Sequence, residues 1–152
     1  MIKNIFSQEI SEEVILRIEK LNPKSTPNWG TMSVDQMLAH CNVTYDYTYH
    51  SEKFTPPNAV KRMLLKAFVK PMVVSEKAYP KNGRTAAEFK MVGEKDFERE
   101  KSKLIENIRR TQQLGATHFE GLENFSFGKL SSSEWNNMFY KHLDHHLTQF
   151  GV

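Results

Sequence analysis

Residues 131–151 read SSSEWNNMFYKHLDHHLTQFG, and this stretch predicts a long closing helix. Ser131 and Glu134 have the spacing of a capping box, in which each side chain accepts a hydrogen bond from the other residue's backbone N–H. The helix should run to about Gln149, because Gly151 is a residue type that commonly stands just past a helix end.

Apolar residues and two histidines share one face of this helix. At 100° per residue, a set of side chains lies within about 40° of one line: Trp135, Phe139, His142, His146 and Gln149. The other side carries Asn136, Asn137, Tyr140, Lys141, Asp144 and Thr148. The pattern is therefore amphipathic even without the histidines, and it predicts that His142 and His146 point into the protein.

Two more helices are predicted in the first third of the chain. The first is capped by Ser7 or Ser11 and stopped by Pro23, with apolar residues at helical spacing between them. The second begins with another capping box, made by Ser33 and a glutamine three residues later, and should span Val34–Tyr49.

A long connection separates the second helix from the third. Between Ser51 and Lys95 prolines and glycines interrupt the pattern, although Asn58–Val69 has the spacing of a short amphipathic helix. The third main helix is predicted over Asp96–Leu114, with Gly115 ending it. Four main helices with one long crossover predict an all-α four-helix bundle.

Length and composition predict one domain over residues 1–152. Lys and Arg total 21 against 18 Asp and Glu, a net charge of +3, and no basic run interleaved with aromatics indicates nucleic-acid binding. The apolar runs are shorter than the ~20 residues of a membrane span, and the N-terminal residues lack the features of a signal peptide. We expect a cytoplasmic protein, and the single Cys41 agrees with a reducing compartment.

The two inward histidines predict a metal site. At i and i+4, His142 and His146 lie one helical turn apart, close enough for both to reach one ion. His40, on the predicted second helix, is the best-placed third donor. Neutral imidazole suits zinc, nickel, copper or iron, so the histidines alone do not select the metal. Three protein ligands would leave a position for water or substrate, as in catalytic zinc sites.

An H-x-x-x-H pair on a helix also occurs as a surface pair or a hydrogen-bonded pair without metal. The central position on the apolar face raises the weight of the metal interpretation, because a core offers few other partners for two adjacent imidazoles. His50 and His118 are expected to be solvated, at a helix end and in a loop. Cys41 lies about 100° from His40 on the helix, which favours a buried structural thiol over a ligand.

Two further residues are candidates for orienting a ligand or a substrate. Tyr47 lies two turns from His40 on nearly the same line of the second helix. Gln149 shares the inward face of the closing helix with His142 and His146. Both assignments rest only on the faces that these residues occupy.

Two segments resemble a known family. WGTMS (residues 29–33) leads to QMLAH (36–40), and KHLDHHLTQFG (141–151) closes the chain. Together they are similar to the DinB-like (YfiT-like) superfamily of metalloproteins, in a branch described only as a domain of unknown function. The H-x-x-x-H-x-x-Q pattern is the more specific part. The chain differs from this branch before Phe127, where Asn124-Phe125-Ser126 replaces His-Pro and an aromatic residue.

The resemblance implies a four-helix bundle with one histidine from the second helix and two from the fourth around nickel or zinc, often in a homodimer. On matching positions these are His40, His142 and His146. Characterised relatives include thiol-dependent transferases and isomerases that use low-molecular-weight thiols, and the fold alone does not assign the reaction. We expect a divalent-metal-binding protein and a metal-dependent transferase or hydrolase acting on a small molecule. The alternative is a non-catalytic helical binding or interaction module.

Overall fold

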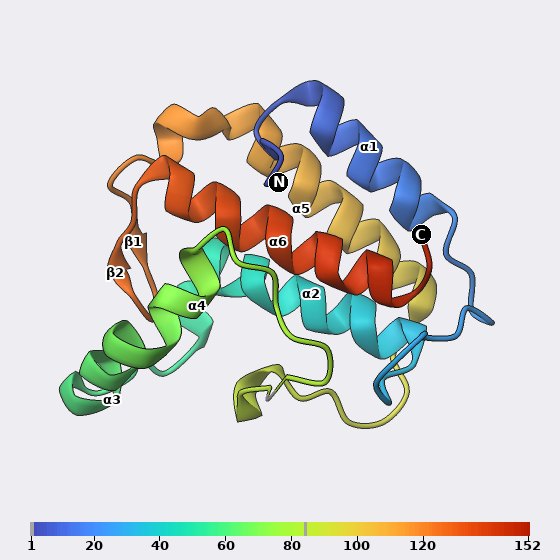
Figure 1. Ribbon diagram of the computed structural model, residues 1–152, viewed down its shortest axis with the longest axis horizontal. Coiled ribbons are helices and arrows are strands. Elements are labelled where there is room, and N and C mark those ends of the chain that lie inside the picture. Colours follow the sequence, from blue (N-terminus) through green and yellow to red (C-terminus); the bar gives the residue numbers. More distant parts are fainter. Residues whose placement is uncertain (1, 84) are drawn as a thin grey trace.

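Four long helices pack against one another in the computed structural model, which describes residues 2–83 and 85–152. They are α1 (Gln8–Glu19), α2 (Val34–Tyr49), α5 (Phe97–Phe119) and α6 (Ser132–Gln149). Both α5 and α6 contact α1 and α2. In Figure 1, α6 crosses the front of the molecule between α1 and α2, with α5 behind it. The predominantly helical fold predicted from the sequence is confirmed.

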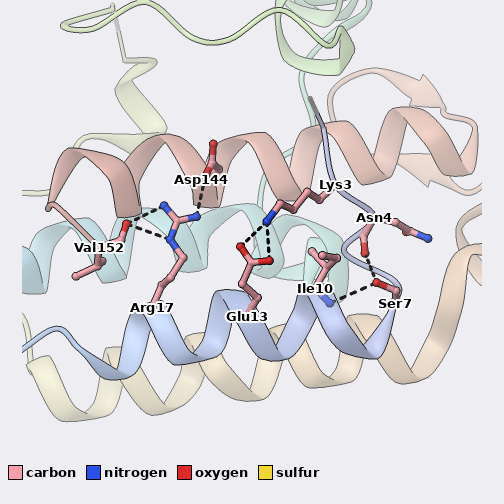
Figure 2. Close-up of polar contacts among 8 residues, drawn as sticks. All are labelled: Lys3, Asn4, Ser7, Ile10, Glu13, Arg17, Asp144 and Val152. Atoms are coloured by element: carbon pink, nitrogen blue, oxygen red, sulfur yellow. Dashed lines mark hydrogen bonds and ion pairs between the residues drawn. The ribbon is translucent and has the colours of Figure 1, made fainter.

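The start of α1 and its attachment to α6 depend on polar contacts (Figure 2). Of the two predicted caps, Ser7 is the residue used: its hydroxyl accepts from the Ile10 backbone N–H and donates to the Asn4 carbonyl. Further along α1, the Arg17 guanidinium donates to Asp144 of α6 at 2.7 Å and to the Val152 carbonyl at 2.8 Å. These bonds hold α1 alongside the second half of α6.

A stack of aromatic rings sets the register between α2 and α6. The rings of Tyr45 and Phe139 are nearly parallel, with centroids 5.0 Å apart, and Phe139 also stacks on Trp135. All three side chains are at most 1% exposed. Because Tyr45 faces Phe139 while His40 lies beside His146, the two helices run antiparallel. The core therefore places His40 opposite the second half of α6.

The third main helix extends beyond its predicted end. Gly115 has φ +71° and ψ 166°, which interrupts the helix as expected, but helical structure resumes and continues to Phe119. Phe119 is fully buried in the core, and its burial favours this extra turn. The expectation that His118 lies in a loop is therefore wrong, although its side chain is exposed as predicted.

The crossover between α2 and α5 is more helical than the sequence indicated. After η1 (Ser51–Lys53) come α3 (Ala59–Leu64), the π-helical η2 (Leu65–Val69) and α4 (Lys70–Val74). These three form one helical arm, residues 59–74, which projects from the other helices in Figure 1.

The widened turn of the arm lies just before Pro71, where the Lys70 N–H bonds the Leu65 carbonyl five residues back. Proline has no N–H to donate, and its ring would clash with a regular helix, so the wider turn relieves that strain.

The rest of the connection contains η3 (Ala87–Phe89).

Between α5 and α6, where the sequence indicated only a loop, the chain forms a two-stranded antiparallel hairpin. Its strands are β1 (Glu123–Asn124) and β2 (Gly128–Lys129), with Asn124 paired to Gly128.

The arm also covers a face of α6 that was expected to be solvated. Tyr140 and Lys141 are each 4% exposed, so their predicted outward position is wrong. For Lys141 the reason is that α4 packs on α6, and the Lys141 ammonium donates to the carbonyls of Met72 and Ser75. Tyr140 instead belongs to the hydrophobic core, near Lys3 and residues of α1. Burial lowers the pKa of Lys141 to about 8. The periodicity of α6 gave no signal for this second covering element.

The outer side of the arm is unusually apolar. Exposed large hydrophobic residues lie along it, namely Val60, Met63, Leu64, Phe68 and Met72. Phe68 is 76% exposed. Within residues 2–83 and 85–152, no helix has the length and apolar character that crossing a bilayer requires.

Candidate metal centre

The antiparallel packing of α2 and α6 brings His40, His142 and His146 together. One ring nitrogen from each lies within 4.8 Å of the others. The Nε2 atoms of His40 and His142 are 2.9 Å apart, and the ring centroids of His40 and His146 are 4.6 Å apart. His40 and His146 are 5% and 7% exposed, and His142 is half-buried.

Acceptors on the outside of the cluster set the orientation of two of the rings. His40 Nδ1 lies 2.8 Å from the Phe89 carbonyl, and His146 Nδ1 lies 2.8 Å from Gln149 Oε1. The Gln149 amide nitrogen in turn donates to the Trp29 carbonyl at 2.7 Å, which fixes its oxygen toward His146. Since carbonyl oxygens only accept, both Nδ1 atoms carry the proton, and the Nε2 lone pairs face the centre of the cluster.

His142 can adopt either tautomer. Its Nδ1 lies 3.2 Å from the Thr44 hydroxyl, and its Nε2 faces His40 Nε2. With the proton on Nε2, His142 donates to His40. With the proton on Nδ1, it donates to Thr44, and three lone pairs converge with no hydrogen between them.

This donor set fits a divalent ion that prefers nitrogen. Two nitrogens bound to one tetrahedral zinc lie about 3.3 Å apart, and the observed separations, from 2.9 Å to within 4.8 Å, bracket that value. The bonds from the outer nitrogens to Phe89 and Gln149 are the kind that orient histidine ligands in metal sites. Zinc, nickel, copper and iron all accept imidazole.

Residues 6–151 match the family described as Protein of unknown function (DUF1569). The chain belongs to this family. The match takes in α1, α2, α5 and α6, and so all three histidines of the cluster. Comparison with curated proteins and with solved structures gives no match.

Burial keeps the three histidines of this DUF1569 chain neutral. The pKa of His146 falls to about 3, mainly because of burial and next because of His40. Burial, followed by His40 and His146, lowers the pKa of His142 well below 6.5. Burial also lowers the pKa of His40, although its bond to the Phe89 carbonyl opposes the shift. Neutral imidazole is the form that binds metal, so at pH 7 these histidines need not lose a proton to the solvent before an ion can bind.

The structure places the other sequence candidates in different positions. Gln149 contacts the cluster directly through His146. Tyr47 packs against Phe89, whose ring lies against His40, so it faces the cluster across another ring. Cys41 is 1% exposed, and burial raises the pKa of its thiol far above its ordinary value.

His145, next to the cluster, packs between Trp29 and Tyr79. His50 is half-exposed at the end of α2, where its ring lies 3.8 Å from Glu52. The structure thus keeps both of these histidines out of the group formed by His40, His142 and His146.

Sequence reasoning missed the Phe89 carbonyl as a partner of His40. Phe89 lies in the part of the crossover that has no helical periodicity, and nothing local to it signals a site. Thr44, by contrast, stands one turn after His40, so the spacing places both on one face. Trp29 belongs to the WGTMS segment, but its contribution is a backbone carbonyl, which residue type does not reveal.

Proposed function

We propose that this chain is a divalent-metal-binding protein of the DinB-like type, in which α1, α2, α5 and α6 form the four-helix bundle. His40, His142 and His146 would hold nickel or zinc. The observation that carries the proposal is the convergence of three imidazole nitrogens within 4.8 Å. The outer nitrogens of His40 and His146 each bond to an oxygen acceptor of the protein. Histidines that bind metal are commonly oriented in this way, which supports a metal site over a chance grouping of histidines.

We further propose that the protein is a metal-dependent enzyme acting on a small molecule, as a thiol-dependent transferase or a hydrolase. A bound ion would supply Lewis acidity, polarising a substrate group and lowering the pKa of a bound water or thiol. Cys41 cannot provide the thiol, because it is buried and its pKa is raised. The thiol would therefore have to come from a separate low-molecular-weight compound. We propose a cytoplasmic location, where the reducing environment keeps such thiols available.

A second candidate function is a non-catalytic binding module. The burial of His40 and His146 favours it, since structural metal sites are closed and catalytic sites keep an open position. A visible-range spectrum of the Co²⁺-loaded protein, recorded with and without 2-mercaptoethanol, separates the two. A spectral change on adding the thiol supports an open position, and an unchanged spectrum supports the closed module.

Metal content tests the first proposal. The protein should be purified without a histidine tag, and its nickel and zinc measured by mass spectrometry before and after dialysis against each ion. We expect about one ion per chain after loading. Protein that takes up neither ion at micromolar concentration refutes the metal function.

Gly30 offers a test of the support behind His146. A Cβ added there would lie 2.7 Å from the Gln149 amide nitrogen, and the φ of +82° is itself unfavourable for alanine. Gly30→Ala should therefore displace Gln149 from both Trp29 and His146. We expect metal affinity, measured by competition with a chromophoric chelator, to fall about tenfold or more.

Gly121→Ala is the matched control for this prediction. Gly121 has a similar φ of +72°, but nothing lies within 4 Å of an added Cβ. The control should lose stability, by about 1–2 kcal/mol in urea unfolding, while it keeps its metal affinity. Equal affinity in the two variants would show that Gln149 does not support the site.

We also propose that the chain forms a homodimer through the helical arm. Three basic residues of the arm already pair with carboxylates of the same chain, in Lys61–Glu88, Arg62–Glu123 and Lys70–Glu134. Apart from Lys66, the exposed side chains that remain on the outer side of the arm are mostly large and apolar. Such a surface suits contact with another protein surface better than contact with an anionic partner.

Sedimentation equilibrium should show a dimer that Phe68→Asp converts to monomer. Leu16→Asp, at an exposed position on α1, should leave the dimer intact. A monomeric parent at tens of micromolar would contradict this proposal.

A further inference from the structure

Four aromatic side chains form a cluster outside the main core. Tyr47 lies at its centre, with ring centroids 4.5 Å from Phe54, 4.9 Å from Phe125 and 5.6 Å from Phe89. All four are half-buried, and none belongs to the buried core of the described residues. The aromatic cluster is assembled from four separate segments: α2, the residue after η1, the end of η3 and the β1–β2 connection. Packing of the main helices therefore does not require these rings.

Phe89 joins the aromatic cluster to the histidines. Its ring lies edge-on to His40 at 5.6 Å and to His142 at 6.4 Å, while its other neighbour is Tyr47. Its backbone carbonyl accepts from His40 Nδ1. The ring and the carbonyl thus have separate roles: the carbonyl orients a histidine, and the ring fills the space between the histidines and Tyr47.

Apart from the bond between the Phe89 carbonyl and His40, the segment that carries Phe89 is attached by surface contacts. It consists of the three-residue η3, whose flanking residues Ala86 and Lys90 are exposed. Glu88 pairs with Lys61 of the arm at 2.6 Å, and both side chains are about half-exposed. An ion pair this exposed to solvent contributes little to stability. The ring of Phe89 can therefore leave its place at far lower cost than a core ring such as Phe139.

We propose that Phe89 is a gate, and that its ring stands where a planar aromatic group of the substrate binds beside the metal. Tyr47, which contacts the Phe89 ring directly, is then the residue that determines specificity for that group. This inference rests on the proposed metal function and names its substrate class: a small molecule with a metal-binding atom next to an aromatic ring. The physical basis is that aromatic rings attract one another in offset-stacked or edge-to-face pairs with centroids 4.5–7 Å apart, and Phe89 meets Tyr47 edge-to-face at 5.6 Å.

Two small ligands test the proposal on Co²⁺-loaded protein. Imidazole and 4-phenylimidazole present the same coordinating nitrogen, and only the second carries an aromatic ring. Their binding is followed by the visible absorption of Co²⁺. We expect the parent to bind 4-phenylimidazole about tenfold more tightly than imidazole, as one or two added ring contacts would provide.

Variants assign the preference to named residues. Tyr47→Ala should reduce it to about twofold or less without changing imidazole affinity. Phe89→Ala, which keeps the carbonyl on His40, should bind 4-phenylimidazole more tightly than the parent, because the competing ring is gone. Leu16→Ala, at an exposed position on α1 away from the arm, is the control and should behave like the parent.

The results distinguish failure of the Phe89 gate from failure of the proposed metal function. A parent that binds Co²⁺ but shows no preference for 4-phenylimidazole refutes the gate and leaves the metal function standing. Equal losses of both ligands in Tyr47→Ala also refute it, since they would show a merely structural role. A parent that does not bind Co²⁺ refutes the proposed function and the gate together.

Discussion

Replacing His142 or His146 with alanine is expected to abolish stoichiometric metal binding. Loss of a residue that only orients a ligand commonly costs 10–100-fold in affinity, so loss of a ligand itself should cost more than about 100-fold. Both histidines come from α6, and each contributes one of the three converging nitrogens. The measurement is metal content after gel filtration, at micromolar protein.

The metal-free fold should survive these substitutions. Each replaces a neutral imidazole, half-buried at His142 and buried at His146, with a small apolar side chain, so a circular dichroism spectrum like that of the parent is expected. His118→Ala is the control, because His118 lies exposed in the last turn of α5. Either variant that keeps one ion per chain would remove that histidine from the ligand set.

Acidification should begin to destabilise the protein at pH values well above those at which carboxylates titrate. The pKa of His146 is about 3 in the folded protein, against 6.5 in an unfolded chain, and the pKa values of His40 and His142 are also lowered. Between these values the unfolded chain binds protons that the folded one does not. The free energy of unfolding therefore rises with pH in this window. The stability that the neutral histidines contribute is lost progressively as pH falls below about 6.5.

The expected loss is about 1.4 kcal/mol per pH unit for each histidine that stays neutral in the folded state. For His146 this amounts to about 2 kcal/mol at pH 5, a large share of a typical total of 5–15 kcal/mol. Urea unfolding at pH 7.5 and pH 5, without metal, measures it. His118→Gln should show the same pH dependence as the parent, and a parent stability that is flat over this range would contradict the prediction.

Bound metal should add to the same trend. An ion that binds only neutral imidazole stabilises the folded state by an amount set by its free concentration over its dissociation constant, and protons compete for the site. The rise in melting temperature on adding zinc should therefore be large at pH 7.5 and small at pH 5. An equal rise at both pH values would argue against a site made of three histidines.

Local sequence signals predicted the elements that carry the histidines. The two capping boxes give α2 and α6 the expected starts, because a capping box depends on residues three positions apart and on nothing else in the fold. Helical periodicity then placed His142, His146 and Gln149 on one face. Periodicity alone does not place His40 beside these residues, because its position depends on how α2 docks on α6. The Tyr45–Phe139 stack sets that docking.

The rest of the site depends on a segment with no periodicity. Phe89 reaches His40 across 49 positions, through a connection broken by prolines and glycines. The same connection supplies the arm that buries Lys141. The contact of Phe89 comes from tertiary packing of an irregular segment. Hydrophobic spacing predicted a helix over Asn58–Val69, but it gave no signal for where that helix packs.

The distribution of the three histidines along the chain has a consequence for biosynthesis. His40 and His142 are 102 positions apart, and His146 lies on the last helix. At about 5–20 residues per second, a ribosome needs about 5–20 s to add the intervening residues. During that interval the nascent chain offers His40 alone, without the pair on α6 that could chelate an ion. Acquisition of metal would therefore report that α6 has docked, and during refolding of the purified protein the absorption of a bound Co²⁺ ion should not appear before α6 packs against α2.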